Sequence, residues 1–191
     1  MSSSASGPSP LQQSIVAAVD GLVRSRGWSA TTMTDVAKAA GVSRQTVYNE
    51  FGSRDGLIQA YVVREIETLL AEVDVRVRAN AHDAKQALTD AFAVFLKLAS
   101  DEPVVRVIVA DAEGGEVIRL LTETGRALAT DYLGALVHEV WPQVSLDDAR
   151  LLAESMARLA ISHALVPTQS PEAIAADVTR IFGPFVDELL A

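Results

Sequence analysis

The sequence predicts an all-α protein, and three observations support this class. Apolar residues make up 49% of the 191 residues and aromatic residues only 5%, which suits a helical core of Leu, Val and Ala. Apolar side chains recur at helical spacing along most of the chain. Ser, Thr, Gly and Pro stand where helices would begin or end, and no segment predicts a strand.

The first predicted helix follows a Ser- and Pro-rich arm. Residues 1–9 contain no apolar run and are expected to be disordered. Residues 10–26 carry apolar side chains at helical spacing, and Gly27 is a natural end for this helix.

Two short helices are expected next. Thr32 can cap the first of them, because its side chain can accept from the amide of Asp35 while the Asp35 carboxylate reaches back to the Thr32 amide. This helix should end at Gly41, since glycine adopts the left-handed conformation of a helix end at low cost. Ser43 is placed to cap the second short helix, residues 44–50.

Long helices fill the rest of the chain. Ser53 should cap a helix over residues 54–79. Gly183-Pro184 predicts a bend or a break in the last helix, because proline removes a backbone donor. The further predicted helices span residues 83–99, 102–112, 116–140, 146–166 and 171–190.

Residues 33–52, MTDVAKAAGVSRQTVYNEFG, meet the geometric demands of a helix-turn-helix. Ala37 is small where two steeply crossed helices come closest. Gly41 allows the turn a positive φ, and Val47 provides a branched apolar anchor for the second helix. In such a motif the second helix enters the major groove of DNA.

The predicted second helix directs hydrogen-bonding groups outward. Its first turn should meet base edges, where Arg pairs with guanine and Gln with adenine. Tyr, Asn and Thr side chains suit phosphate oxygens, and helix N-termini add partial positive charge there. The alternative is a surface helix that is polar only for solubility. The candidate DNA-contacting residues are Thr32, Ser43, Arg44, Gln45, Thr46, Tyr48, Asn49 and Arg54.

Charge is distributed unevenly along the chain. Its net charge is −9, but residues 1–54 hold five Lys/Arg against three Asp/Glu, a balance of +2. The remaining residues hold 11 against 22, a balance of −11. The N-terminal part is therefore the part suited to a polyanion.

Several other classes of function find no support in the sequence. No cysteine is present, which excludes disulfides and thiolate metal sites and favours a reducing cytoplasm. The three histidines, His82, His138 and His163, lack metal-ligand spacing on one helix, and no HExxH, GxSxG or P-loop motif occurs. We therefore expect no metal, no cofactor and no enzymatic activity. We also expect no signal peptide and no membrane span.

The segment TTMTDVAKAAGVSRQTVYNEFGSRDGLIQAY, residues 31–61, resembles the DNA-binding domain of the TetR family of transcriptional regulators. The Thr-rich start, the AxxAGVS turn, the TVYxxF helix and the capped long helix at Ser53 carry the resemblance. It covers residues 10–62, and the rest is similar in length and helical layout. Gly56 stands where a better helix former is usual, and Arg54 replaces a common Lys.

The resemblance implies an all-helical homodimer that reads a palindromic operator. Residues 10–53 would form the helix-turn-helix domain, and residues 54–191 a helical effector-binding and dimerisation domain. The last two long helices would pair with their copies. The two recognition helices must lie about 34–36 Å apart to enter successive major grooves, and an effector would change this separation. We expect a ligand-responsive repressor; an activator, or a DNA-binding module without small-molecule control, is the alternative.

The predicted effector is an elongated apolar molecule such as a long-chain fatty acid. In residues 91–99 and 104–110 the apolar side chains cover more of the predicted helix surface than one narrow packing stripe. Cationic groups are sparse after residue 54. The ligand would lie between helices 54–79, 83–99, 116–140 and 146–166. The same residue types also fill ordinary cores. For His163 two interpretations are open: a histidine packed in the core or the dimer interface, and a polar contact to the effector. The expected wall residues are Phe92, Phe95, Tyr132 and Met156.

Overall fold

The computed structural model describes residues 7–101 and 115–191, and this part of the chain is helical with no strand, as expected for an all-α protein. The predicted helix over residues 102–112, and with it the apolar run 104–110, lies outside the described residues. The helices are α1 (Pro10–Arg26), α2 (Met33–Ala39), α3 (Arg44–Phe51), α4 (Arg54–Ala79), α5 (Ala84–Asp101), α7 (Gly115–Val140), α8 (Leu146–Leu165) and α9 (Pro171–Leu190).

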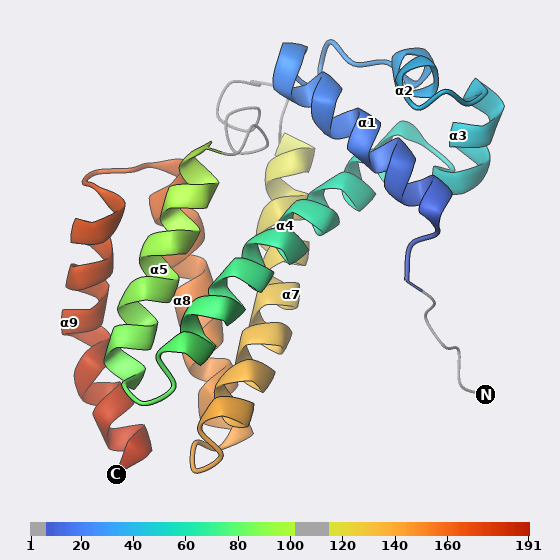
Figure 1. The fold of residues 1–191 in the computed structure, drawn as a ribbon. Coiled ribbons are helices and arrows are strands. Elements are labelled where there is room, and N and C mark those ends of the chain that lie inside the picture. Colours follow the sequence, from blue (N-terminus) through green and yellow to red (C-terminus); the bar gives the residue numbers. More distant parts are fainter. Residues whose placement is uncertain (1–6, 102–114) are drawn as a thin grey trace, which may run out of the picture.

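The first three helices form a small unit around the start of α4 (Figure 1). One apolar core joins α1, α2 and α3 to the first half of α4, and its fully buried members include Ile15, Val36, Val47, Leu57 and Tyr61. Because α4 belongs to this core and then continues into the larger bundle, one continuous helix connects the two parts.

Side-chain caps set the helix starts, as the sequence predicts. The Thr32 amide donates to Asp35 Oδ2 over 3.0 Å, and the Asp35 amide donates to Thr32 Oγ1 over 3.2 Å. The Ser43 and Ser53 hydroxyls accept from the amides three residues later, at 3.0 Å in each case. Ser9, which the sequence placed in the arm, caps α1 in the same way.

Two glycines are explained by their surroundings. Gly41 has φ 68°, as a turn between helices requires. Gly56 lies in the first turn of α4, and a Cβ there would stand 2.2 Å from the Phe51 carbonyl oxygen. This close approach accounts for a glycine where a better helix former is usual.

The last helix is not broken at Gly183-Pro184. Helix α9 continues from Pro171 to Leu190 through the proline, so a break at this point was the wrong expectation. Its Gly183 passes so close to α5 that a Cβ would stand 3.2 Å from Lys85 Cδ. Packing against α5 offsets the single backbone hydrogen bond that Pro184 cannot make.

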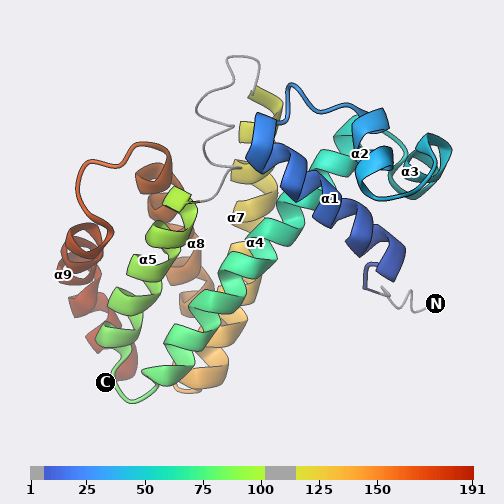
Figure 2. The same cartoon turned by 45° about the horizontal axis from the view of Figure 1, so that its top comes forward.

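The larger unit is a bundle of α4, α5, α7, α8 and α9 (Figures 1 and 2). Helix α7 packs against α4 and α8, and α5 packs against α4, α8 and α9. At the end of α4 remote from α1–α3, Arg78 forms a bidentate ion pair with Glu139, and the Trp141 indole donates to the Ala81 carbonyl oxygen over 3.0 Å. Within the described residues no helix combines the length and apolarity needed to cross a bilayer.

Candidate DNA-binding and effector sites

The turn between α2 and α3 has the geometry that the sequence predicts. Ala37 is buried where α2 approaches α3, and the Val42 amide donates to the Ala37 carbonyl oxygen over 2.9 Å. Val47 is completely buried and anchors α3 in the core. The opposite side of α3 is therefore held outward at a fixed angle.

The outward side of α3 carries two bonded side-chain pairs. Arg44 Nη2 donates to the Tyr48 hydroxyl over 3.4 Å, and the guanidinium carbon stands 5.4 Å from the centre of the Tyr48 ring. Gln45 Nε2 donates to Asn49 Oδ1 over 2.9 Å. Each pair joins residues one helical turn apart, so the candidate base-reading side chains are aligned in the free protein.

The hydroxyls of the predicted surface at Thr32, Ser43 and Thr46 are hydrogen-bonded at the helix starts. The hydroxyls of Ser43 and Thr46 are hydrogen-bonded to each other at 2.8 Å. The Thr32 hydroxyl donates to Asp35 Oδ2 over 2.6 Å, and Arg26 lies 2.9 Å from the same oxygen. The bonds from the Thr32 hydroxyl and amide, aided by Arg26, lower the pKa of Asp35 from 3.8 to about 2.

Arg54 has an internal role that the sequence did not indicate. Its guanidinium stacks 4.3 Å from the centre of the Trp28 ring and donates to the Trp28 carbonyl oxygen over 2.8 Å. A guanidinium has five N–H donors, so donors remain for a phosphate. Arg54 therefore stabilises the protein as well as being a candidate DNA contact.

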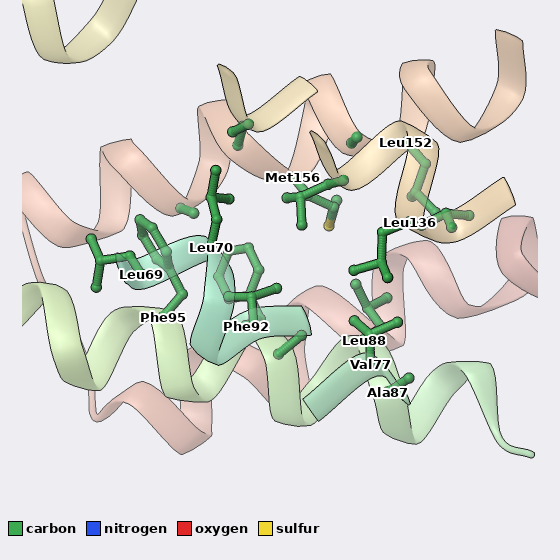
Figure 3. Close-up of a pocket in the computed structure, with 18 of the residues that line it drawn as sticks. Leu69, Leu70, Val77, Ala87, Leu88, Phe92, Phe95, Leu136, Leu152 and Met156 are labelled. Carbon is green, nitrogen blue, oxygen red and sulfur yellow. The ribbon is translucent and has the colours of Figure 1, made fainter. Parts of the chain in front are cut away.

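A cavity of about 190 Å³ lies between α4, α5, α7, α8 and α9, more than ten times the space that one water requires. Its wall is almost wholly aliphatic and aromatic (Figure 3). Helix α9 closes part of it with Val186, Leu189 and Leu190, although the sequence placed the ligand among the other four helices only. The labelled wall residues are Leu69, Leu70, Val77, Ala87, Leu88, Phe92, Phe95, Leu136, Leu152 and Met156.

Three of the four expected wall residues line this cavity, and Tyr132 does not. Phe92, Phe95 and Met156 contribute to the wall. Tyr132 is 43% exposed, and its hydroxyl donates to Asp74 Oδ2 over 3.0 Å at the outer edge between α4 and α7. The expectation of a wall position was wrong because α7 turns its neighbour Leu133 inward, and a phenol next to a carboxylate is better placed at the surface.

Two polar side chains lie at or near the cavity. Glu65 is 5% exposed, lines the wall and pairs with Arg64, whose Nη2 is 2.9 Å from Glu65 Oε1. His163 is half-buried and meets Phe92 edge-on, with ring centres 6.4 Å apart. His163 is not among the residues that line the cavity, and it contacts one of them, Phe92.

The chain matches two family models. Residues 15–61 match the model described as bacterial regulatory proteins, tetR family, and residues 83–184, more than half of the chain, match bacterial tetracyclin repressor, C-terminal domain. The chain belongs to the TetR family of transcriptional regulators. It is therefore a DNA-binding helix-turn-helix regulator, and the families and relatives that it matches are not enzymes.

Two relatives extend the match over nearly the whole chain. The HTH-type transcriptional regulator AlkX of Mycobacterium tuberculosis (strain ATCC 25618 / H37Rv) is 32% identical over 180 residues, which cover 93% of this chain and 85% of that protein. The solved structure of TetR family repressor AlkX from Dietzia sp. strain DQ12-45-1b, implicated in biodegradation of n-alkanes, matches with TM-score 0.83 and 33% identity, over 96% of this chain and 98% of that one.

A more distant structure matches in fold alone. The putative TetR-family regulator from Mesorhizobium loti MAFF303099 has TM-score 0.66 and 17% identity, over 93% of this chain and 95% of that one. The TetR-family arrangement of helices thus persists at low sequence identity.

Sequence reasoning missed Glu65, an acidic residue of the cavity wall, although a signal was present. Glu65 continues the buried helical series of Ile58, Val62 and Leu69. An acidic residue at a core position of a long helix indicates a special environment. The stacking of Arg54 on Trp28 gave no comparable signal, because the two residues are 26 positions apart.

Proposed function

We propose that this TetR-family regulator is a repressor that binds a palindromic operator as a homodimer and is released by a small apolar effector. The observation that carries the proposal is a wall shared between the cavity and the N-terminal core. Ile66 and Leu70 of α4 belong to that core and also line the cavity. A ligand in the cavity would therefore press on side chains that help to position α1–α3.

The proposed DNA surface is the outward side of α3 with the two helix starts beside it. Residues 10–53 would form the DNA-binding domain, after an arm of residues 1–9. Arg44 and Gln45 would meet base edges in the major groove, with Ser43 and Thr46 beside them. The proposed phosphate contacts are Thr32, Tyr48 and Arg54.

The proposed effector-binding and dimerisation domain is residues 54–191. Large apolar side chains are exposed on the two C-terminal helices: Leu151 on α8 is 57% exposed and Ile181 on α9 is 67% exposed. A second copy of the chain would cover them in a two-fold dimer. Such a dimer would also present two copies of α3 to the two half-sites of a palindrome.

The proposed effector is a long-chain hydrocarbon compound such as a fatty acid. The aliphatic wall supports it, and so does the Dietzia relative that is implicated in biodegradation of n-alkanes. The proposed walls are Phe92, Phe95 and Met156. Polar recognition of a headgroup is not needed for useful affinity, because each buried methylene contributes about 0.8 kcal/mol.

Ligand binding in the cavity is proposed to affect DNA binding through a movement of α4 against α7. Gly125 on α7 crosses α4 so closely that a Cβ would stand 3.0 Å from Ile66 Cδ1. Gly125 and Ile66 both line the cavity. A ligand that separates α4 from α7 here would tilt α4 and change the spacing of the two α3 helices.

The test begins with selection of bound duplexes from a random-sequence DNA library by the purified protein. We expect enrichment of one palindrome. Fatty acids of increasing length should then release that duplex and raise the melting temperature of the protein. Enrichment without release or stabilisation by any chain length would exclude the lipid-like effector, and a lack of enrichment would contradict the proposed DNA surface.

A further inference from the structure

Two amide side chains occupy the outermost face of α3. At about 100° per residue, Gln45 and Asn49 stand roughly 160° and 200° around the helix axis from Val47. Val47 is fully buried, so these two positions point directly away from the core. Both side chains are exposed. They are therefore the side chains that would reach deepest into a groove entered by α3.

The bond between these side chains leaves the base-reading groups of Gln45 available. Gln45 Nε2 donates to Asn49 Oδ1 over 2.9 Å. A primary amide has two N–H donors and one carbonyl acceptor. After donating to Asn49, Gln45 retains one N–H and its carbonyl oxygen. A glutamine reads adenine with one donor to N7 and one acceptor from the N6 amino group.

We propose that Asn49 is a positioning residue, which holds Gln45 in the orientation that reads adenine. A free glutamine side chain must be ordered when it binds, and this ordering weakens a complex. The bond to Asn49 removes part of that freedom before DNA is met. This role replaces the phosphate contact predicted for Asn49, and it rests on the proposed entry of α3 into the major groove.

The neighbouring pair follows the same pattern. Arg44 is bonded to Tyr48, also four residues later, and lies over its ring. Helix α3 therefore carries two adjacent base-reading side chains, each held by the residue one turn further on. The two pairs predict that each half-site contains a guanine and an adenine in neighbouring base pairs, or in base pairs with one other between them.

The test uses the duplex selected from the random library by the wild-type protein. Each adenine is replaced in turn by 7-deazaadenine, which lacks the N7 acceptor. One adenine per half-site should be sensitive, with binding weakened by about 2- to 12-fold, because one of the two hydrogen bonds of a bidentate base contact is lost. Gln45→Ala should abolish this sensitivity, because it removes the donor to N7.

The variants of Asn49 separate positioning from phosphate contact. Asn49→Ala should weaken binding of the selected duplex by about 2- to 12-fold, the ordering cost of one long side chain, and should reduce the sensitivity at the same adenine. In a Gln45→Ala background the Asn49→Ala change should have no further effect. Asn49→Asp keeps the acceptor for Gln45, so the adenine sensitivity should persist although the added negative charge weakens binding of every sequence.

Four outcomes would overturn the inference. Additive effects of Gln45→Ala and Asn49→Ala, or an Asn49→Ala loss that is equal for all sequences, would restore the phosphate contact. A selected duplex in which no adenine responds to Gln45→Ala would remove the proposed reader. A library that yields no enriched sequence would overturn the proposed function, and this inference with it. Melting curves of all variants verify that these surface changes leave the fold intact.

Discussion

Arg54 lies over the ring of Trp28, with the guanidinium carbon 4.3 Å from the ring centre and a hydrogen bond to the Trp28 carbonyl oxygen at 2.8 Å. Trp28 is buried in the segment between α1 and α2, whereas Arg54 begins α4. The contact therefore ties the N-terminal helices to the helix that enters the larger bundle. A lysine could not stack and donate in this way, because it lacks the planar fork.

Replacement of this arginine should reduce both stability and DNA affinity. Arg54→Ala is expected to lower the free energy of unfolding by about 1–3 kcal/mol, through loss of the stacking and of a charge-assisted hydrogen bond. It should also weaken binding to all DNA sequences alike. The slope of log affinity against log salt concentration should fall by about one, the value of one phosphate contact. Urea unfolding and titrations at several salt concentrations measure the two effects. Arg54→Lys is the control: it keeps the charge, so its salt slope should stay near that of the wild type while stability falls.

Arg44 and Tyr48 should have different effects on sequence preference. Arg44→Ala should cost about 1–3 kcal/mol on the selected duplex and relax preference at one base position. Tyr48→Phe removes only the hydroxyl, which is the proposed phosphate contact, and keeps the ring that holds Arg44. It should therefore weaken binding to all sequences to a similar degree. Competition with duplexes changed at single positions distinguishes the two. An Arg44→Ala variant that binds every DNA as tightly as the wild type would contradict the major-groove role of α3.

The cap of α2 should respond to acid. The pKa of Asp35 is lowered from 3.8 to about 2 by the Thr32 bonds and by Arg26, so the ionised carboxylate stabilises the folded state. This contribution is complete above about pH 4 and is lost as the pH falls through about 2. The difference in urea midpoint between wild type and Asp35→Asn should therefore shrink between pH 4 and pH 2. A difference that stays constant over that range would show that ionisation of Asp35 does not matter.

The helical framework was predictable because its signals are local. The caps at Thr32, Ser43 and Ser53 depend on residues three positions apart, and each is present in the structure. The same applies to the glycine turn at Gly41. In a short helix with one buried anchor, Val47, the outward residues follow directly from the helical period.

Contacts between distant helices were not predictable in the same way. Tyr132 belongs to an apolar run, but whether it faces a cavity or the surface depends on how α7 is rotated against α4. Its bond to Asp74, 58 residues earlier in the chain, reflects that rotation. The continuity of α9 through Pro184 likewise depends on packing against α5. The local sequence shows that Pro184 removes a backbone hydrogen bond. Whether the helix continues in spite of this depends on its packing against α5.

Single charges on the outer helices should prevent dimerisation. Leu151→Asp and Ile181→Asp place an unpaired charge where the partner copy would cover an apolar side chain, and burial of such a charge is costly. Both variants should sediment as folded monomers at micromolar concentration, where the wild type sediments as a dimer. Val75→Asp on α4 is a matched control, since Val75 is equally exposed at 57% but lies outside the proposed interface. A wild-type protein that sediments only as a monomer would contradict the proposed dimer.

The cavity should set the length of the effector. Each added methylene that enters it contributes about 0.8 kcal/mol, so affinity should rise roughly fourfold per methylene until the cavity is full. Ala157 lines the wall and is buried. Ala157→Leu would occupy part of the space, so release of DNA should reach its maximum at a shorter chain than in the wild type. Titration of the protein–DNA complex with fatty acids of increasing length measures this maximum.

Tyr132 provides the control, because its hydroxyl faces Asp74 at the surface. Tyr132→Phe should leave the preferred chain length unchanged, whereas an effector held by Tyr132 would lose affinity. Ten buried methylenes would contribute roughly 8 kcal/mol before ordering costs, which allows micromolar binding without a strong polar contact. If no chain length releases DNA or raises the melting temperature, the lipid-like effector is excluded. The DNA-binding role of α3 would stand even then, because it depends on a different surface.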